Sequence, residues 1–183
     1  MKIAIDIDST LHHYWDQFAA AAKRRFGVDL PYEHQVTWDI ALLRPEQVKV
    51  CIAETHAEPT VLAAEPYPGA AEVIARWRDQ GHFIHITSHR SADAHQITQA
   101  WLERCGIPYD ELYCSWDKIS RCREIGIDVL IDDSPVNLRH AIDAGIRAAT
   151  ILHPWNRELV EEEDVIAAPD WPSLERELTP FLT

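Results

Sequence analysis

The stretch Met1-Lys-Ile-Ala-Ile-Asp-Ile-Asp-Ser-Thr10 decides how the rest of the chain is interpreted. Its apolar positions from Ile3 to Ile7 are typical of a short β-strand that is covered on both faces of a parallel sheet. Asp6 and Asp8 come where this strand ends. Burying a carboxylate without a partner is costly, and two neighbouring carboxylates repel each other. The pattern therefore indicates either an acidic turn satisfied by backbone N–H groups and solvent, or a divalent-metal site that holds a phosphate.

The size and composition of the chain restrict its class. Its 183 residues suffice for one domain with a modest insertion. No apolar run approaches the roughly 20 residues that span a membrane, and the sequence starts directly with a strand, so we expect no membrane segment and no signal peptide. The four cysteines lack a CxxC spacing, which favours reduced thiols in a cytoplasmic protein. The formal net charge of −13 argues against binding to a nucleic-acid polymer.

Strands and helices alternate along the second part of the chain. This pattern predicts a parallel, doubly wound α/β sheet. We assign residues 1–11 and 67–183 to this core and residues 12–66 to a small helical cap inserted after the first strand. Helices are expected over 12–26 and from Pro45 to about residue 56 in the cap, and a helix that starts at Ser91 is expected in the core. Ligands of such sheets bind at the carboxyl ends of the strands.

Four motifs fall at these expected strand ends or next to them. They are Asp6-x-Asp8, then Ile84-His-Ile-Thr-Ser88, then Lys118, then Val129-Leu-Ile-Asp-Asp133. Together and in this order they resemble the haloacid dehalogenase superfamily of phosphohydrolases. The resemblance covers the first strand and residues 67–152.

The resemblance implies a role for each motif. Asp6 would attack phosphorus, and Asp8 would be the general acid and then the base. Thr87, Ser88 and Lys118 would bind the phosphoryl group. Mg²⁺ would be held by Asp6, the backbone carbonyl of Asp8, and the pair Asp132-Asp133, because Mg²⁺ prefers hard oxygen ligands. We expect Asp132 to ligate directly and Asp133 to act through water or through Lys118.

Simpler interpretations of the same residues stay open. Thr87 could cap the end of a strand, and Lys118 could be a surface lysine, with Arg90 or Arg121 as the cation instead. Asp132-Asp133 could cap the helix expected after Pro135, since acids favour helix N-termini. The histidines His82 and His85 would point to opposite sides of one strand, which argues against a shared metal site.

The cap suggests the substrate. The overall layout is similar to the 5′(3′)-deoxyribonucleotidase group, in the position of the cap, the pair Trp38-Asp39, and the Lys that precedes Ile-Asp-Asp. That resemblance implies that aromatic cap residues, here Trp15, Phe18 and Trp38, stack on the base; alternatively they form the core of the cap itself. The sequence departs from the group at Ser9, where Gly is usual, and at His12-His13-Tyr14, where an acid-bearing stretch is common.

Three functions follow from these patterns. The first is a Mg²⁺-dependent phosphomonoesterase for a small phosphorylated metabolite, with a (deoxy)nucleoside monophosphate as the favoured substrate. The second is the same enzyme acting on a sugar phosphate or another metabolite. The third is a non-catalytic binding module that keeps only the fold. The sequence leaves open whether the chain is a monomer or a homodimer.

Overall fold

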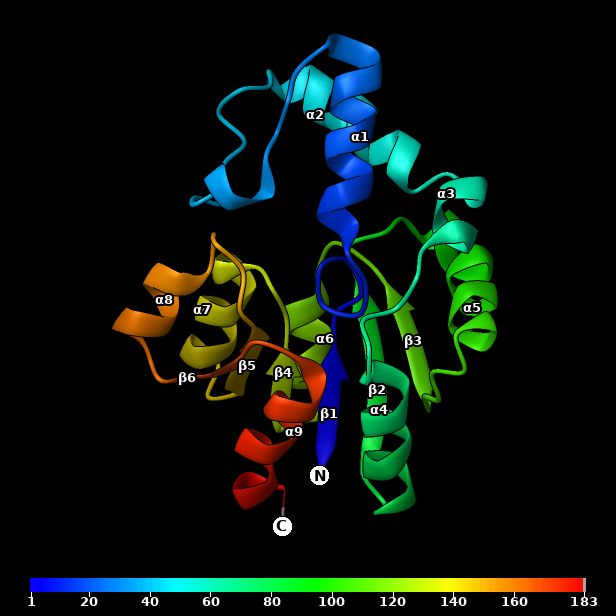
Figure 1. The fold of residues 1–183 in the computed structure, drawn as a ribbon. Helices are drawn as coiled ribbons and strands as arrows, with labels where there is room; N and C mark the ends of the chain where they lie inside the picture. Colours follow the sequence, from blue (N-terminus) through cyan, green and yellow to red (C-terminus); the bar gives the residue numbers. More distant parts are fainter. Residues whose placement is uncertain (183) are drawn as a thin grey trace.

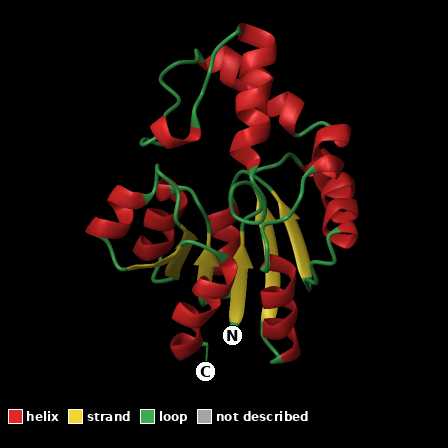
Figure 2. Cartoon of the chain, viewed as in Figure 1, coloured by secondary structure: helices red, strands yellow, loops and turns green. Residues whose placement is uncertain are grey.

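A six-stranded sheet forms the centre of the protein (Figures 1 and 2). The computed structural model describes residues 1–182. The strand order is β3-β2-β1-β4-β5-β6, and every neighbouring pair is parallel, so the predicted α/β sheet is confirmed. The strands are β1 (Lys2–Ile5), β2 (Phe83–Ser88), β3 (Glu111–Cys114), β4 (Val129–Ile131), β5 (Arg147–Ile151) and β6 (Val165–Ala168).

Helices cover both faces of this sheet. Side chains alternate along a strand, so Ile3 and Ile5 face one side and Ala4 faces the other. The first side packs on α4 (Ala70–Asp79), α5 (His95–Arg104) and α9 (Trp171–Leu178), and the second on α6 (Lys118–Ile125) and α7 (Pro135–Asp143). Strands buried on both faces explain the continuous apolar run at the N-terminus.

The helical insertion lies above the carboxyl ends of the strands, at the top of Figure 1. It contains α1 (Tyr14–Phe26), α2 (Pro45–Thr55) and α3 (Glu58–Ala63). The first two helices share a hydrophobic cluster built around Trp15, Phe18 and Cys51. In contrast, Val61 of α3 packs into the main cluster of the core. By its packing, the third helix of the insertion therefore belongs with the core.

The two chain segments that join cap and core run side by side. His12 forms bridges with Asp8 and with Pro66, and the Tyr67 N–H donates to the Leu11 carbonyl at 2.7 Å. Both connections thus pass directly beside Asp8.

Several elements differ from the expectation. Ser91 makes no capping bond, and the segment opens with a 3₁₀ turn over Ala92–Ala94 before α5 starts at His95. Helix α3 was not expected because it contains Pro59, which the first turn of a helix tolerates. Strand β6 and helix α8 (Arg157–Glu162) also escaped the sequence pattern, because both are short and flank the exposed acidic run. Among the described residues, no helix is both long and apolar enough to cross a bilayer.

Candidate active site

The order of the strands places the acidic motifs together. Strand β1 pairs directly with β4, at the point where the strand order reverses, and Ile5 lies opposite Ile131. The residue after each strand is therefore an immediate neighbour of the other: the Asp6 N–H donates to the Ile131 carbonyl at 2.9 Å. Polar groups at such a switch point are where ligands of doubly wound sheets bind.

Three buried carboxylates meet at this point. Asp6, Asp132 and Asp133 each offer an oxygen, and these oxygens all lie within 4.8 Å of one another. The Lys118 Nζ, at the first residue of α6, lies 2.5 Å from Asp6 Oδ1 and 2.8 Å from Asp132 Oδ2. One lysine thus faces three carboxylates, and its hydrogen bonds go to Asp6 and Asp132; none goes to Asp133, the residue expected to act through it.

The pKa values reflect this excess of negative charge. Burial raises the pKa of Asp6 to about 7, with Lys118 opposing the rise and Asp132 adding to it. Burial and the neighbouring carboxylates Asp132 and Asp6 also hold the pKa of Asp133 well above its ordinary value. Burial would lower the pKa of Lys118, but Asp132 and Asp6 outweigh it and raise that pKa. Three hard oxygen donors around a single lysine fit a divalent cation such as Mg²⁺, which would supply the missing positive charge.

Of the three carboxylates, Asp132 accepts the most hydrogen bonds from groups of the protein. Its Oδ1 accepts from the Ser134 N–H at 2.9 Å, and the Asn137 side-chain amide donates to both of its oxygens at 3.1 Å. Ser134 caps α7, and Asn137 lies in the first turn of that helix. The start of α7 therefore fixes Asp132, a role for Asn137 that the sequence pattern did not suggest.

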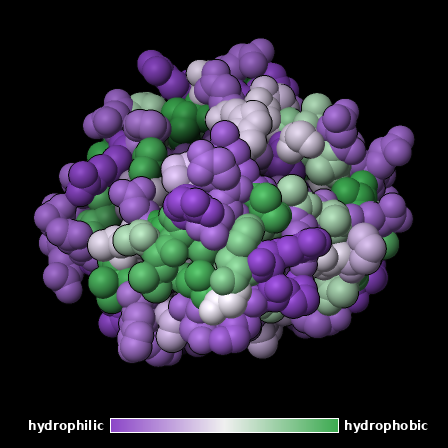
Figure 3. Space-filling view, turned by 90° about the horizontal axis from the view of Figure 1, so that it is seen from above, coloured by the Kyte–Doolittle hydropathy of each residue, from purple (hydrophilic) through white to green (hydrophobic). Residues whose placement is uncertain are grey.

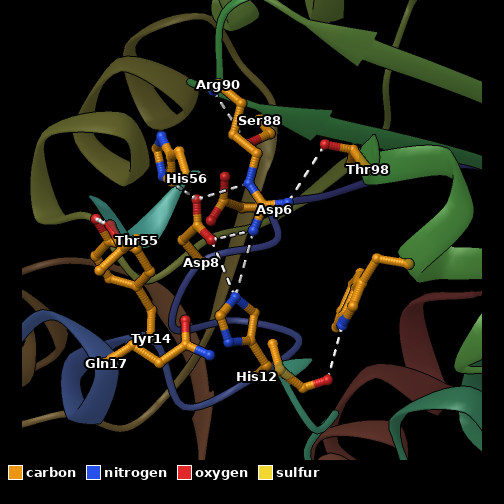
Figure 4. Close-up of polar contacts among 12 residues, drawn as sticks. Asp6, Asp8, His12, Tyr14, Gln17, Thr55, His56, Ser88, Arg90 and Thr98 are labelled. Atoms are coloured by element: carbon orange, nitrogen blue, oxygen red, sulfur yellow. Dashed lines mark hydrogen bonds and ion pairs between the residues drawn. The ribbon is translucent and has the colours of Figure 1, made fainter. Parts of the chain in front are cut away.

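Asp8 has a separate set of charged partners, drawn in Figure 4. Arg90 donates from Nη2 to Asp8 Oδ1 at 2.6 Å and from Nε to Oδ2 at 3.3 Å. The Nε2 atoms of His12 and His56 lie 3.0 and 3.2 Å from the two oxygens. Burial alone would raise the pKa of Asp8, but Arg90 and the two histidines outweigh it and hold this pKa well below its ordinary value. Asp8 is therefore an ionised carboxylate here.

The Arg90 side chain is part of the protein interior. Only 1% of it is exposed, and its Nη1 donates to the Thr98 hydroxyl at 3.3 Å. The sequence offered Arg90 as a substitute for Lys118, but the two cations divide the acids between them. Lys118 pairs with Asp6 and Asp132, whereas Arg90 pairs with Asp8.

The turn that follows Asp8 has an unusual backbone. Ser9 has a φ of 61°, a left-handed conformation that glycine adopts at no cost in side-chain clashes. This geometry gives a physical reason why a glycine would suit the position. The turn is closed by hydrogen bonds from the N–H groups of Thr10 and Leu11 to the Ile7 carbonyl.

Thr87 and Ser88 end strand β2, next to β1. Both are fully buried, and neither lines the cavity described below. Ser88 Oγ accepts from the Arg90 N–H at 3.2 Å. Among the described residues, nothing hydrogen bonds to the Thr87 hydroxyl. A buried hydroxyl without a partner is costly, so this group is available for a ligand that approaches the strand end.

A cavity of about 600 Å³ opens between the acidic cluster and the cap. Asp6, Asp8 and Lys118 line its floor, and the upper walls are mostly apolar. Figure 3, a view onto the cap end of the molecule, shows hydrophobic side chains gathered on this face. The apolar part of these walls comprises Tyr14, Trp15, Phe18, Trp38, Ile40, Leu43, Val48, Ile52 and Trp155, and the polar side chains of Gln35, Thr37, Asp39 and Lys49 also line the cavity.

The three predicted substrate residues have different environments. Trp15 and Phe18 are stacked at 5.7 Å and buried in the cap cluster, and Trp15 Nε1 donates to the Leu30 carbonyl. These two rings belong to the hydrophobic core of the cap and also line the cavity. Trp38 is 46% exposed and lines the cavity, so its ring is free to contact a ligand.

The raised pKa of Asp6 leads to a prediction about stability. The folded protein keeps a proton on Asp6 that the unfolded chain releases near pH 4, so stability falls as pH rises from about 4 to 7. In metal-free buffer at pH 8, Asp6→Asn should therefore stabilise the protein by about 1–3 kcal/mol, a rise in Tm of roughly 2–10 °C. Thermal unfolding in EDTA measures this.

The exposed Asp143, at the end of α7, provides the matched control. Asp143→Asn should change Tm by no more than about 1–2 °C. The gain from Asp6→Asn should be smaller at pH 5 than at pH 8. A lower Tm for Asp6→Asn at pH 8 would mean that the ion pair with Lys118 outweighs the repulsion.

Comparisons with known proteins agree with this geometry. Residues 1–175 match the family described as 5′ nucleotidase, deoxy (pyrimidine), cytosolic type C protein. A Chlorobaculum tepidum protein, provisionally named a 5′(3′)-deoxyribonucleotidase, is 27% identical over 99% of this chain and 91% of its own length. A haloacid dehalogenase family hydrolase from Deinococcus radiodurans, solved with phosphate and sodium, has a TM-score of 0.67 at 16% identity, covering 99% of this chain and 94% of the other. The chain thus belongs to this nucleotidase family and is a phosphatase with the haloacid dehalogenase fold.

Proposed function

We propose that the protein is a Mg²⁺-dependent phosphomonoesterase that forms a phosphoryl-aspartate at Asp6 and acts on (deoxy)nucleoside monophosphates. The observation that carries the proposal is the convergence of three buried carboxylates and Lys118 at the ends of β1 and β4. Asp6, the Asp8 carbonyl, Asp132 and Asp133 are the groups that would hold the cation. When bound, Mg²⁺ neutralises the cluster and draws electron density from the phosphoryl oxygens.

The first step is transfer of the phosphoryl group to Asp6. An Asp6 oxygen bonds to phosphorus while the bond from phosphorus to the ester oxygen breaks. Lys118, already bonded to Asp6, balances the charge of the incoming phosphate. The Thr87 hydroxyl, which has no hydrogen-bond partner among the described residues, would donate to a phosphoryl oxygen. Ser88, the other residue predicted to bind the phosphate, has its hydroxyl oxygen on the Arg90 N–H and would be the next donor along the chain.

Asp8 would transfer the protons in both steps. In the first step it gives a proton to the leaving oxygen, and in the second it takes one from the water that attacks phosphorus, which releases phosphate and restores Asp6. The contacts with Arg90 and the two histidines keep Asp8 ionised, so the arrangement in the structure suits the second step directly. To act as the acid, Asp8 must first exchange some of these contacts for a proton.

The walls of the cavity favour a nucleotide over a sugar phosphate. The wall above the acids is mostly aromatic and aliphatic, with Gln35, Thr37, Asp39 and Lys49 as its polar members, so it offers more stacking surface for a base than hydrogen-bonding groups for the hydroxyls of a sugar. A flat base can stack on Trp38 and contact the Trp15–Phe18 pair. The small cavity and the net charge of −13 do not favour a nucleic-acid polymer.

We predict that phosphate release from dUMP or dTMP requires Mg²⁺ and is lost in Asp6→Asn. Without the nucleophile no covalent intermediate forms, so kcat should fall by at least about 10³-fold, in the range found for triad nucleophiles. A phosphate-release assay with and without EDTA measures this, and circular dichroism checks the fold. Turnover of Asp6→Asn within tenfold of the parent would contradict the assignment. No release from any phosphomonoester by the parent would favour a non-catalytic binding module.

The role of Asp8 predicts a dependence on the leaving group. In Asp8→Asn, kcat/KM for a nucleotide should fall about 10²–10⁴-fold, because an alkoxide leaves poorly without a proton. For p-nitrophenyl phosphate the loss should be much smaller, because nitrophenolate leaves without one. Steady-state kinetics on both substrates separate the two cases. Equal losses would mean that Asp8 acts on the fold or on the metal rather than on the leaving oxygen.

The nucleotide preference can be tested at Trp38. We expect the parent to prefer dUMP and dTMP over glucose 6-phosphate in kcat/KM. Trp38→Ala should lower kcat/KM for the nucleotides by roughly 5- to 100-fold, since stacking on one base contributes about 1–3 kcal/mol. The matched control is Leu42→Ala, in the same exposed loop but outside the cavity wall. A parent that prefers the sugar phosphate would instead support the alternative substrate class.

A further inference from the structure

A short buried loop follows strand β5 and contacts Asp133 of the acidic cluster. It contains His153, Pro154, Trp155 and Asn156, and we call it the HPWN loop. His153, Trp155 and Asn156 are 2%, 6% and 0% exposed, respectively. Buried polar side chains in a loop are uncommon without partners, so the contacts of each one are informative.

Asn156 fixes the backbone of the HPWN loop. Its side-chain oxygen accepts from the His153 N–H at 2.9 Å. Its amide donates to the Thr150 hydroxyl at 2.9 Å, the Ile151 carbonyl at 3.0 Å and the Asp133 carbonyl at 3.3 Å. One side chain therefore ties this loop to β5 and to the backbone of a predicted metal ligand.

His153 is held at both ring nitrogens. Its Nε2 donates to the Ser9 carbonyl at 2.7 Å, which leaves Nδ1 to accept from the Tyr32 hydroxyl at 2.7 Å. Ser9 lies in the turn that follows Asp8, and Tyr32 lies in the cap. The imidazole thus has a fixed plane, and the Trp155 indole stacks on it with ring centroids 4.5 Å apart and planes 2° apart.

The stacked indole points its N–H at Asp133. Trp155 Nε1 lies 3.2 Å from Asp133 Oδ2. In the part of the chain that the structure describes, this is the only side-chain hydrogen bond to the Asp133 carboxylate, whereas Asp132 is held by Asn137 and Lys118. The bond occupies one oxygen of Asp133 and leaves Oδ1 without a donor from a side chain.

We propose that Trp155 is a positioning residue for divalent-metal binding, which orients the Asp133 carboxylate toward the cation through a fixed indole N–H. The proposal rests on the metal site of the proposed function, and it holds whether Asp133 ligates directly or through water. Partners that orient metal-binding groups in this way typically change metal affinity 10- to 100-fold when they are removed. The same ring contacts Trp15 and Tyr32, so it also joins the metal site to the cap.

The test is binding of Mn²⁺ alone, a hard cation whose free form is counted by electron paramagnetic resonance. Trp155→Phe keeps the stacked ring and removes the N–H, and we expect its Kd for Mn²⁺ to rise about tenfold or more. The matched control is Trp101→Phe, which removes a buried indole N–H that donates to the Ala64 carbonyl at 2.8 Å. The control should keep its Kd within about twofold. A folded Trp155→Phe with the Kd of the parent would overturn the proposal.

A second comparison separates orientation of Asp133 from damage to the fold. If Trp155 acts through Asp133, then adding Trp155→Phe to Asp133→Asn should leave the Kd of that single variant unchanged. The same loss in both backgrounds would overturn the proposal. The readout is metal binding and needs no turnover. A parent that binds Mn²⁺ but hydrolyses no phosphomonoester would therefore remove the proposed function without touching this inference.

Discussion

The repulsion among three buried carboxylates is the constraint on which the site depends. Asp6 follows β1, and Asp132 and Asp133 follow β4, and these strands are direct neighbours. The fold therefore forces the acids together, and a single lysine is too little charge to balance them. A bound divalent cation would offset this repulsion, because it would supply the positive charge that the three carboxylates and one lysine lack.

Asp8, the second carboxylate of the first motif, has charged partners of its own. Arg90 comes from the segment after β2, while His12 and His56 come from the two ends of the cap region. The linkers of the cap run beside this group, so the position of the cap and the surroundings of Asp8 are physically connected. The HPWN loop makes a similar connection on the metal side through Tyr32 and His153. Contacts of the cap thus reach both Asp8 and the turn that follows it.

The hydrophobic pattern shows where the strands end, and so it placed Asp6, Asp132 and Asp133 at strand ends. Lys118 starts a helix, and it was assigned to the same site through the resemblance to the haloacid dehalogenase superfamily. The side chains of these four residues do lie together. The partners of Asp8 and Asp133 could not be predicted in the same way. Arg90, His56 and Trp155 lie on loops or helix ends, and their approach depends on packing between distant segments rather than on periodicity. The edge strand β6 was missed because its four residues show no clear alternation.

The proposed function requires that Asp6, which the fold holds beside Asp132 and Asp133, bonds to the phosphorus atom of the substrate. Trapping the intermediate tests this claim most directly. The enzyme would be mixed with substrate and Mg²⁺, quenched, and treated with borohydride, which reduces an acyl phosphate to an alcohol and converts phosphorylated aspartate to homoserine. Peptide mass spectrometry should then find homoserine at position 6 only when both substrate and Mg²⁺ are present. Homoserine at another acid, or none during active turnover, would contradict the account.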